Sequence, residues 1–189
     1  IDANGVIQWS RTVGGLDKEQ AFNIIQTNDG GYAVAGFTKL LGINGDEDMY
    51  IVKLDSGGTF QWHKSISGFD FGYRSYDYAN SIIQTGDGGY ILAGSTWAPP
   101  VYINIYMVKL DENGNFLWSR IFGEEGINIY VATSIIQTSD GGLAIAGYYR
   151  NSFTDDFYIA KLDENGLLQW NTAIGGIDDE RANSIIQTL

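Results

Sequence analysis

The sequence predicts an all-β fold built from repeated four-stranded antiparallel sheets. Three observations point to it. An Asp-x-x-Gly turn precedes a tryptophan in four places, each time with the Trp seven residues after the Asp. An Ile-Ile-Gln-Thr run follows each tryptophan after a loop of variable length, so the repeat period is about 50 residues. No segment shows helical periodicity over the length of a helix. The Asp/Trp pairs are Asp2/Trp9, Asp55/Trp62, Asp111/Trp118 and Asp163/Trp170.

Each repeat begins with a predicted inner strand that reads Ala-x-x-Ile-Ile-Gln-Thr. Its copies start at Ala21, Ala79, Ala132 and Ala182. Three of them lead into an Asp-Gly-Gly turn, where glycine supplies the positive φ that a tight hairpin needs. The second strand is an apolar run that ends in Ala-Gly. Its copies are residues 32–36, 90–94 and 143–147.

The third predicted strand ends in Lys-Leu-Asp, at residues 50–55, 106–111 and 158–163. The Asp-x-x-Gly turn then leads to the tryptophan strand, in which apolar and polar residues alternate. The first three strands are largely apolar, as expected when both faces of a sheet are covered. The half-polar tryptophan strand therefore belongs at the outer edge. Sheets with one inner, two buried and one outer strand are typical of propeller blades.

The combined motif resembles the seven-bladed β-propeller repeats of secreted and surface proteins from bacteria and archaea. It reads Ala-x-Ser-Ile-Ile-Gln-Thr-x-Asp-Gly-Gly-Tyr, then Ala-Gly, Lys-Leu-Asp-x-x-Gly, Trp and Gly-Gly. The resemblance covers the whole chain. It implies a β-propeller, an extracellular or cell-surface location, and a module of a longer multidomain protein that usually has no known activity.

The repeat divides the chain into three complete blades and two partial ones. The complete blades are predicted at residues 16–68, 69–123 and 124–175. Residues 1–15 are expected to form the outer strand of a preceding blade, and residues 176–189 the inner strand of a following blade. We expect residues 1–189 to be a fragment of a larger propeller. Such a fragment exposes a long apolar edge and flank, which promotes association with other chains.

Composition excludes several function classes. The net charge of −12 disfavours nucleic acids and anionic membranes as partners, since both reward clusters of Lys and Arg. No apolar run is long enough for a membrane-spanning helix. The chain has no cysteine, which excludes disulfides, thiolate catalysis and thiolate-bound zinc. The strong acidity suits solubility outside the cell and cation binding.

The loops that vary between repeats are expected to share one face of the disc, and variable loops on a repeated scaffold usually carry function. This face is rich in aromatic and acidic residues. Such a composition suits sugar recognition, by rings that stack on a pyranose, and it also suits a protein-binding patch. Packing of the rings between blades is the alternative. The candidate ligand-binding residues are Tyr73, Tyr76, Tyr78, Trp97, Tyr102, Tyr130, Tyr148 and Tyr149.

Two further groups of residues invite a specific interpretation. The run Asp46, Glu47 and Asp48 is the candidate calcium site, with an exposed acidic loop as the alternative; no other cofactor is predicted. The repeated tryptophans could be read as a ligand-binding ladder. Their fixed position beside an apolar residue instead predicts a structural role in packing one blade on the next. They are Trp9, Trp62, Trp118 and Trp170.

The sequence favours a noncatalytic module for protein–protein interaction, adhesion or surface and filament assembly. Its partners would be other protein chains, or other domains of a longer parent protein. A glycan-binding propeller is the first alternative, and a carbohydrate-active enzyme is a more distant one. The only histidine, His63, falls on the polar side of a predicted outer strand and does not indicate catalysis. Sugar binding predicts exposed rings, protein assembly predicts covered rings, and an enzyme predicts two converging carboxylates in a central pocket.

Overall fold

A computed structural model describes residues 3–39, 46–68, 75–97, 103–123, 128–151 and 153–188. Across these residues there are twelve strands, arranged in three four-stranded antiparallel sheets, and no helix. The all-β prediction and the four-stranded unit are therefore confirmed.

Each sheet is a simple meander, because strands that follow one another in sequence are hydrogen-bonded neighbours. The first sheet contains β1 (Glu19–Gln26), β2 (Tyr32–Thr38), β3 (Asp48–Leu54) and β4 (Phe60–Ile66). The second contains β5 (Tyr76–Gln84), β6 (Tyr90–Trp97), β7 (Asn104–Leu110) and β8 (Phe116–Phe122). The third contains β9 (Ile129–Gln137), β10 (Leu143–Arg150), β11 (Asp155–Leu162) and β12 (Leu168–Ile174).

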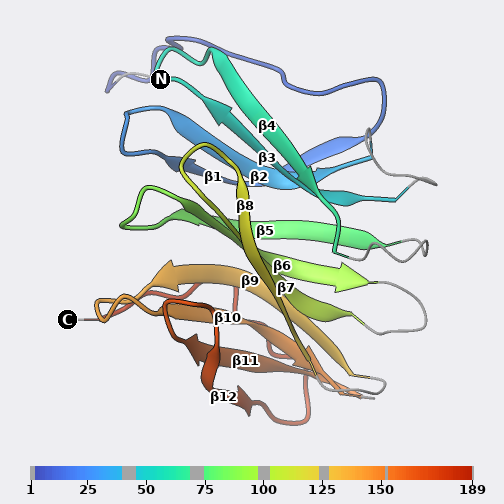
Figure 1. Ribbon diagram of the computed structural model, residues 1–189. Helices are drawn as coiled ribbons and strands as arrows, with labels where there is room; N and C mark the ends of the chain where they lie inside the picture. Colours follow the sequence, from blue (N-terminus) through green and yellow to red (C-terminus); the bar gives the residue numbers. More distant parts are fainter. Residues whose placement is uncertain are drawn as a thin grey trace.

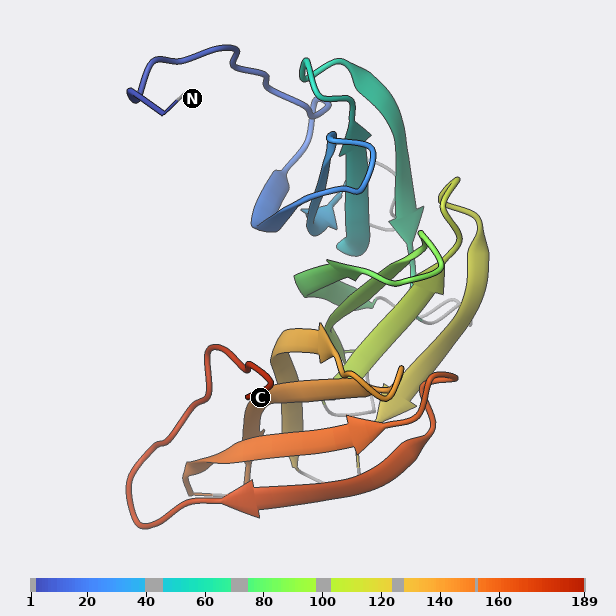
Figure 2. The ribbon, with the colours of Figure 1, turned by 90° about the vertical axis from the view of Figure 1, so that its left-hand side faces the viewer.

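The three sheets follow one another through the molecule, with β1–β4 at the top and β9–β12 at the bottom of Figure 1. Figure 2 shows them fanned along an open arc, with β4 and β8 on its outer side. The short turns between the first two and the last two strands of each sheet lie at one end, on the left of Figure 1. The described sheets do not close into a ring.

The two flanking segments differ from their prediction. Neither residues 3–18 nor residues 175–188 form a strand in the part of the chain that is described. A strand needs a hydrogen-bonded neighbour along its length, and neither segment has one there. The second segment still runs beside β9, since Thr133 Oγ1 donates to the Ala182 carbonyl (2.5 Å) and the Ile185 N–H donates to Ser134 Oγ (3.3 Å).

The Asp-Gly-Gly turns close each first hairpin with the same local bonds. At the first turn the Thr27 N–H donates to the Gly31 carbonyl at 2.9 Å. Asp29 Oδ1 accepts from the Gly31 N–H at 3.0 Å. The intervening Gly30 has a φ of 77°, a conformation that other L-residues rarely adopt. The turn sequence therefore sets the hairpin.

A lysine reinforces each of these turns, buried in the first two sheets and partly buried in the third. Lys53 on β3 donates to Asp29 (2.8 Å), Lys109 on β7 to Asp87 (2.8 Å), and Lys161 on β11 to Asp140 (3.1 Å). The hydrogen bonds from Lys53 and Thr27 lower the pKa of Asp29 well below its usual range. Burial alone would raise the pKa of Asp87, but hydrogen bonds from Lys109 and Thr85 outweigh it and lower this pKa to about 2. The Lys of each Lys-Leu-Asp motif is thus paired with the turn that precedes it.

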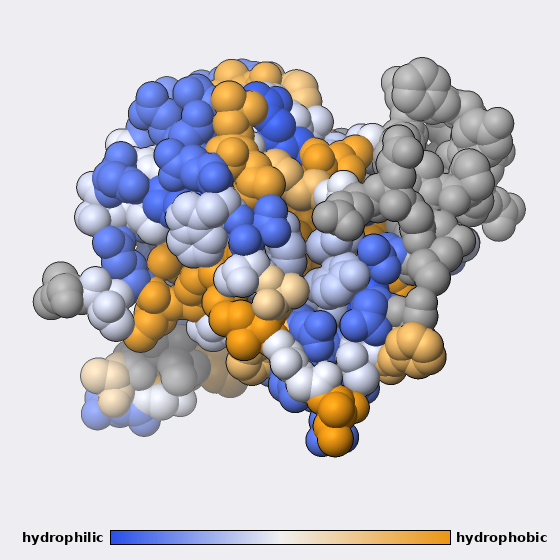
Figure 3. All heavy atoms as spheres, turned by 90° about the horizontal axis from the view of Figure 1, so that it is seen from below, coloured by the Kyte–Doolittle hydropathy of each residue, from blue (hydrophilic) through white to orange (hydrophobic). Residues whose placement is uncertain are grey.

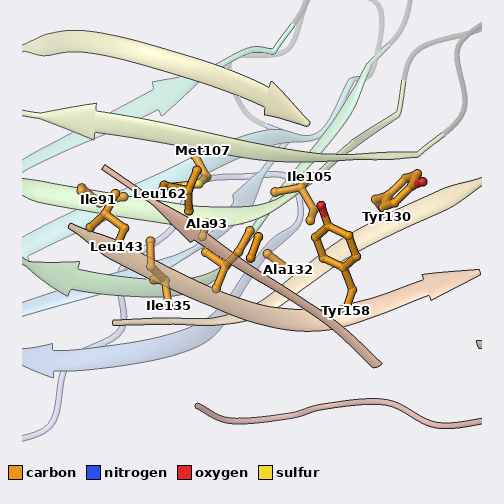
Figure 4. Packing of buried hydrophobic residues seen from close by; sticks show 12 residues of the cluster. Ile91, Ala93, Ile105, Met107, Tyr130, Ala132, Ile135, Leu143, Tyr158 and Leu162 are labelled. Atoms are coloured by element: carbon orange, nitrogen blue, oxygen red, sulfur yellow. The ribbon is translucent and has the colours of Figure 1, made fainter. Parts of the chain in front are cut away.

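The cores lie between consecutive sheets. Figure 4 shows one of them, in which side chains from β6 and β7 face side chains from β9, β10 and β11. A second cluster joins the first two sheets, through Met49 and Ile51 on one side and Leu92 and Tyr106 on the other. Apolar side chains therefore cover both faces of the second sheet, which explains why β6 and β7 are almost wholly buried.

Three tryptophans pack on the sheet that follows them. The Trp62 ring makes an edge contact with Tyr90, at 5.7 Å between centroids. The same ring closes over the next Asp-x-x-Gly turn, since a Cβ added to Gly114 would lie 2.9 Å from it. Trp9 likewise contacts Tyr32 and lies over Gly58, and Trp118 lies over Gly166. Trp170, with no sheet after it among the described residues, is 52% exposed.

Replacing Gly114 by alanine is expected to destabilise the protein by about 2–4 kcal/mol, because it adds a clash with Trp62 to the strain of a positive φ. Gly141 is the matched control: its φ is 84°, but a Cβ there meets nothing within 4 Å. Gly141→Ala should cost only the strain, about 1 kcal/mol. Chemical denaturation followed by circular dichroism gives both values. Equal losses would contradict the packing of Trp62 on this turn.

Candidate functional site

The candidate ligand-binding residues lie at the strand ends opposite the short turns. Tyr76 and Tyr78 begin β5, and Trp97 ends β6. Tyr130 lies on β9, and Tyr148 and Tyr149 lie near the end of β10. Tyr73 and Tyr102 fall outside the described residues. The structure divides this set into one pair that includes the exposed Trp97 and a group of rings packed against other elements.

Tyr76, which is half-buried, and Trp97 form this pair. They are cross-strand partners, and their ring centroids are 5.1 Å apart with an angle of 32° between the planes. Trp97 is 39% exposed, although it belongs to a strand that is otherwise buried. The repeat places Lys39 and Arg150 at the positions equivalent to Trp97, so the aromatic surface belongs to the second sheet. A stacked ring pair of this kind offers a flat apolar surface to a ligand.

Tyr78 packs between the first two sheets. Its ring meets Phe37 edge-on, at 5.2 Å between centroids, and lies near Phe22. Its hydroxyl donates to Glu47 Oε2 at 2.5 Å. Burial, followed by the Glu47 carboxylate, raises the pKa of Tyr78 far above its usual range. Tyr78 therefore joins two sheets and presents little surface to a ligand.

The tyrosines of the third sheet also make internal contacts. Tyr130 is buried and packs against Tyr149 (4.8 Å) and Tyr158 (5.3 Å between centroids). The Arg181 guanidinium lies 4.7 Å from the centre of the Tyr148 ring, a cation–π contact. Contacts within and between sheets thus account for Tyr130, Tyr148 and Tyr149.

The candidate calcium residues are buried at the start of β3. Glu47 pairs with Lys18 and Lys39, each at 3.6 Å, in addition to Tyr78. Asp48 Oδ2 accepts from Ser65 Oγ at 2.8 Å, and burial raises the pKa of Asp48. Within the described ranges, no three acidic or histidine side chains converge in an arrangement suited to a metal ion. The Glu47 carboxylate is thus already occupied by two lysines and a tyrosine hydroxyl.

Sequence reasoning missed two buried carboxylates. Asp77 is fully buried, and its Oδ2 accepts from the Gly68 N–H (2.7 Å) and Ser75 Oγ (2.9 Å). Burial raises the pKa of Asp77, against the effect of these hydrogen bonds. In two of the other repeats, Glu19 and Glu180 accept from the N–H of the equivalent glycines, Gly15 and Gly176, while the remaining repeat has Tyr130 at this position. The signal is an acid two residues before the repeated alanine.

Asp155 is the second of these carboxylates. It is fully buried and lies between two guanidinium groups, those of Arg150 and Arg181. Arg150 Nη2 donates to Asp155 Oδ2 at 2.9 Å, and the Asp155 N–H donates to Asp179 Oδ1 at 3.0 Å. The hydrogen bond from Arg150 is the main cause of its lowered pKa. Arg181 belongs to the segment after β12, so this cluster ties that segment to the third sheet.

A cavity of about 310 Å³ lies over β1 on the side away from the second sheet. Its lining includes Val13, Val34, Phe37 and Tyr50, and Glu19 is its one carboxylate. Glu19 Oε1 already accepts from the Gly15 N–H at 3.2 Å. The cavity is therefore an apolar hollow on a sheet face, and it lacks the carboxylate pair of a glycoside-cleaving site.

The outer faces of the first and third sheets expose side chains that are buried at the internal junctions. Ile24 on β1 is 58% exposed, whereas the equivalent Ile82 and Ile135 are 2% and 3% exposed. Phe157 on β11 is 37% exposed, whereas its equivalents Met49 and Ile105 are at 0%. Figure 3 views the molecule from the side of the third sheet and shows a broken apolar band between hydrophilic residues. We call these two surfaces the open faces.

No protein-family model matches the chain, and no curated protein is significantly similar to it. In the part of the chain that the structure describes, no helix is long and apolar enough to cross a membrane.

Proposed function

We propose that the chain is part of a β-propeller and acts as a noncatalytic extracellular module for protein–protein interaction, adhesion or surface assembly. The open faces are the observation that supports it most directly. Ile24 and Phe157 are exposed on these two faces, whereas the residues at their equivalent repeat positions are buried between sheets. Exposed apolar side chains on a sheet face are typical of protein interaction sites.

The open faces favour a β-sheet as the partner. At the internal junctions the same positions are covered by apolar side chains of the next sheet. A partner with alternating apolar residues on a flat sheet can reproduce these contacts. Other protein chains, or other domains of a longer parent protein, would supply it. The net charge of −12 and the resemblance to secreted repeats support the extracellular assignment, and this charge disfavours nucleic acid.

Sedimentation of the purified chain across a wide concentration range tests the proposal, because each copy presents both open faces to other copies. We expect reversible association that Ile24→Asp and Phe157→Asp weaken. Phe153→Asp is the matched control, since Phe153 is 92% exposed but lies in a loop outside both faces. A chain that stays monomeric at every concentration, with no difference among the variants, would overturn the proposal.

Glycan binding is the second candidate, and the Tyr76–Trp97 ring pair, with Trp97 exposed, favours it. Aromatic rings at such a surface can stack on a sugar face. Trp97→Ala should then abolish binding to an array of microbial polysaccharides and leave self-association unchanged. Loss of polysaccharide binding in Phe157→Asp instead would point away from the ring pair. An enzyme remains the most distant candidate, because Glu19 is the one carboxylate of the cavity over β1.

A further inference from the structure

One backbone hydrogen bond recurs wherever consecutive units of the repeat meet. It runs from the second residue before the repeated alanine to the residue at the start of the third strand in the preceding unit. The three bonds join Asp77 N–H to Glu47 O (2.5 Å), Tyr130 N–H to Ile103 O (2.8 Å) and Glu180 N–H to Asp155 O (2.6 Å). The three junctions therefore place Glu47, Ile103 and Asp155 at one equivalent position.

The side chains at this position differ in chemistry from one junction to the next. We define the junction pair as the residue whose carbonyl accepts this hydrogen bond, together with the residue that follows the N–H donor in sequence. At the first junction Glu47 accepts from the Tyr78 hydroxyl, and at the third the Asp155 carboxylate binds Arg181. At the second junction the pair is Ile103 and Val131, both apolar. The first and third pairs thus contain an ionised side chain, whereas the second pair is apolar.

Other contacts across the junctions repeat with unchanged chemistry. In three of the four Ile-Ile-Gln-Thr runs, the glutamine side chain accepts a backbone N–H from the preceding unit. These bonds join Asn28 to Gln84 (2.8 Å), Gly86 to Gln137 (3.0 Å) and Ser139 to Gln187 (2.8 Å). Contacts that are the same at every junction cannot distinguish one sheet from another, because any unit of the repeat satisfies them.

We propose that the junction pair determines which sheet packs on which. If the third sheet packed on the first, Val131 would face Glu47. If residues 177–188 packed on the second sheet, Arg181 would face Ile103. The first slip removes the hydrogen-bond partner of the buried Glu47 carboxylate, and an unpaired ionised group is costly when it is buried. The second slip takes Arg181 away from the fully buried Asp155, which then keeps only Arg150 of its two guanidinium partners.

The discrimination at the first junction rests on one oxygen of Glu47. Lys18 and Lys39 approach Oε1, and both come from the first sheet, so they accompany Glu47 whichever sheet packs on it. Oε2 accepts from Tyr78 of the second sheet. Val131 offers that oxygen no donor. Because neighbouring junctions differ in chemistry, the junction pairs disfavour any packing that is shifted by one unit of the repeat. Chains with similar adjacent repeats are otherwise prone to this kind of packing error.

Cross-linking during refolding tests this assignment, and the absence of native cysteine makes it direct. Asn28→Cys with Gln84→Cys reports the native junction through a short bis-maleimide. Asn28→Cys with Gln137→Cys reports the slipped one. We expect the ratio of slipped to native cross-link to rise about tenfold when Glu47→Ile and Tyr78→Phe make the first junction apolar.

A second variant also makes the first two junctions alike, but it does so by making the middle junction polar. Ile103→Glu with Val131→Tyr gives the middle junction the chemistry of the first, so the third sheet could then satisfy Glu47. The slipped ratio should rise in this variant too, although it adds a charge where the first variant removes one. Tyr78→Phe alone keeps the packed ring but removes the hydroxyl that distinguishes the second sheet from the third, so it should give a comparable rise.

An unchanged ratio in Tyr78→Phe and in either double variant would overturn the assignment. Equilibrium unfolding of each variant separates loss of discrimination from loss of stability, because a merely structural pair lowers stability and leaves the ratio alone. The result does not depend on the proposed function, since it concerns only packing within the chain.

Discussion

Trp118→Ala is expected to lower the free energy of unfolding by about 3–5 kcal/mol, the usual range for truncating a packed tryptophan. The Trp118 ring packs against the core between the second and third sheets and covers the turn at Gly166. The Arg120 guanidinium lies 5.1 Å from the ring centre. Truncation leaves a cavity between two sheets and exposes this turn, so both the apolar contact and the docking of the next sheet are lost.

Trp170→Ala is the control that the repeat itself supplies. Trp170 occupies the same position in the third sheet, yet no sheet follows it in the described chain and its side chain is half exposed. Its truncation should cost less than about 1 kcal/mol. Urea denaturation followed by far-ultraviolet circular dichroism measures both losses. Similar losses for the two variants would mean that the ring stabilises its own strand and does not join consecutive sheets.

Local chemistry explains why so much of the fold could be predicted. An Asp-Gly-Gly turn between apolar runs determines a hairpin through bonds within five residues, as at Thr27 and Gly31. The alternation in the tryptophan strands placed them at the outer edge, where β4 and β8 lie. The predicted flanking strands do not form in the described chain, because pairing, unlike turn formation, depends on neighbours that the local sequence does not supply.

The candidate site was less predictable, because its contacts join residues that are far apart in sequence. Tyr78 and Tyr130 look like surface aromatics in a variable segment, yet contacts with Glu47 and Tyr158 turn them inward. Conversely, Asp77 reads as one of many loop acids and is fully buried. Each of these outcomes depends on the sheet that packs opposite, which composition does not reveal. The acid two residues before the repeated alanine was the one local signal available.

The buried Asp77 and Asp48 and the turn carboxylates have opposite effects on how stability depends on pH. The pKa of Asp77 and of Asp48 is raised by burial, so each binds its proton more tightly in the folded state. Their contribution to stability is greatest at low pH and is lost as pH rises. The turn carboxylates behave in the opposite way, because their lysine partners favour the ionised form. The pH dependence of the intact chain combines both effects, so the two groups of carboxylates are separated by comparing variants.

Asp87→Ala is expected to destabilise the protein by about 3 kcal/mol near neutral pH, because it leaves the buried Lys109 ammonium without its counter-ion. Lys109→Met should cost less, about 1 kcal/mol, because the Asp87 that remains is mostly exposed and stays hydrated. The double variant Asp87→Ala/Lys109→Met should then be more stable than Asp87→Ala alone. A double variant that loses the sum of the two single losses would show that the pair does not interact.

The same pair predicts the acid response. The pKa of Asp87 is about 2 in the folded protein and about 4 in the unfolded chain, so the folded state binds fewer protons in this interval. Its contribution to stability is therefore complete above pH 4 or so and disappears as pH falls towards 2. Denaturation midpoints measured across this interval should fall less steeply in Asp87→Ala than in the parent chain. Parallel pH profiles would show that Lys109 does not hold the Asp87 carboxylate ionised, and the turn would owe its stability to its backbone bonds instead.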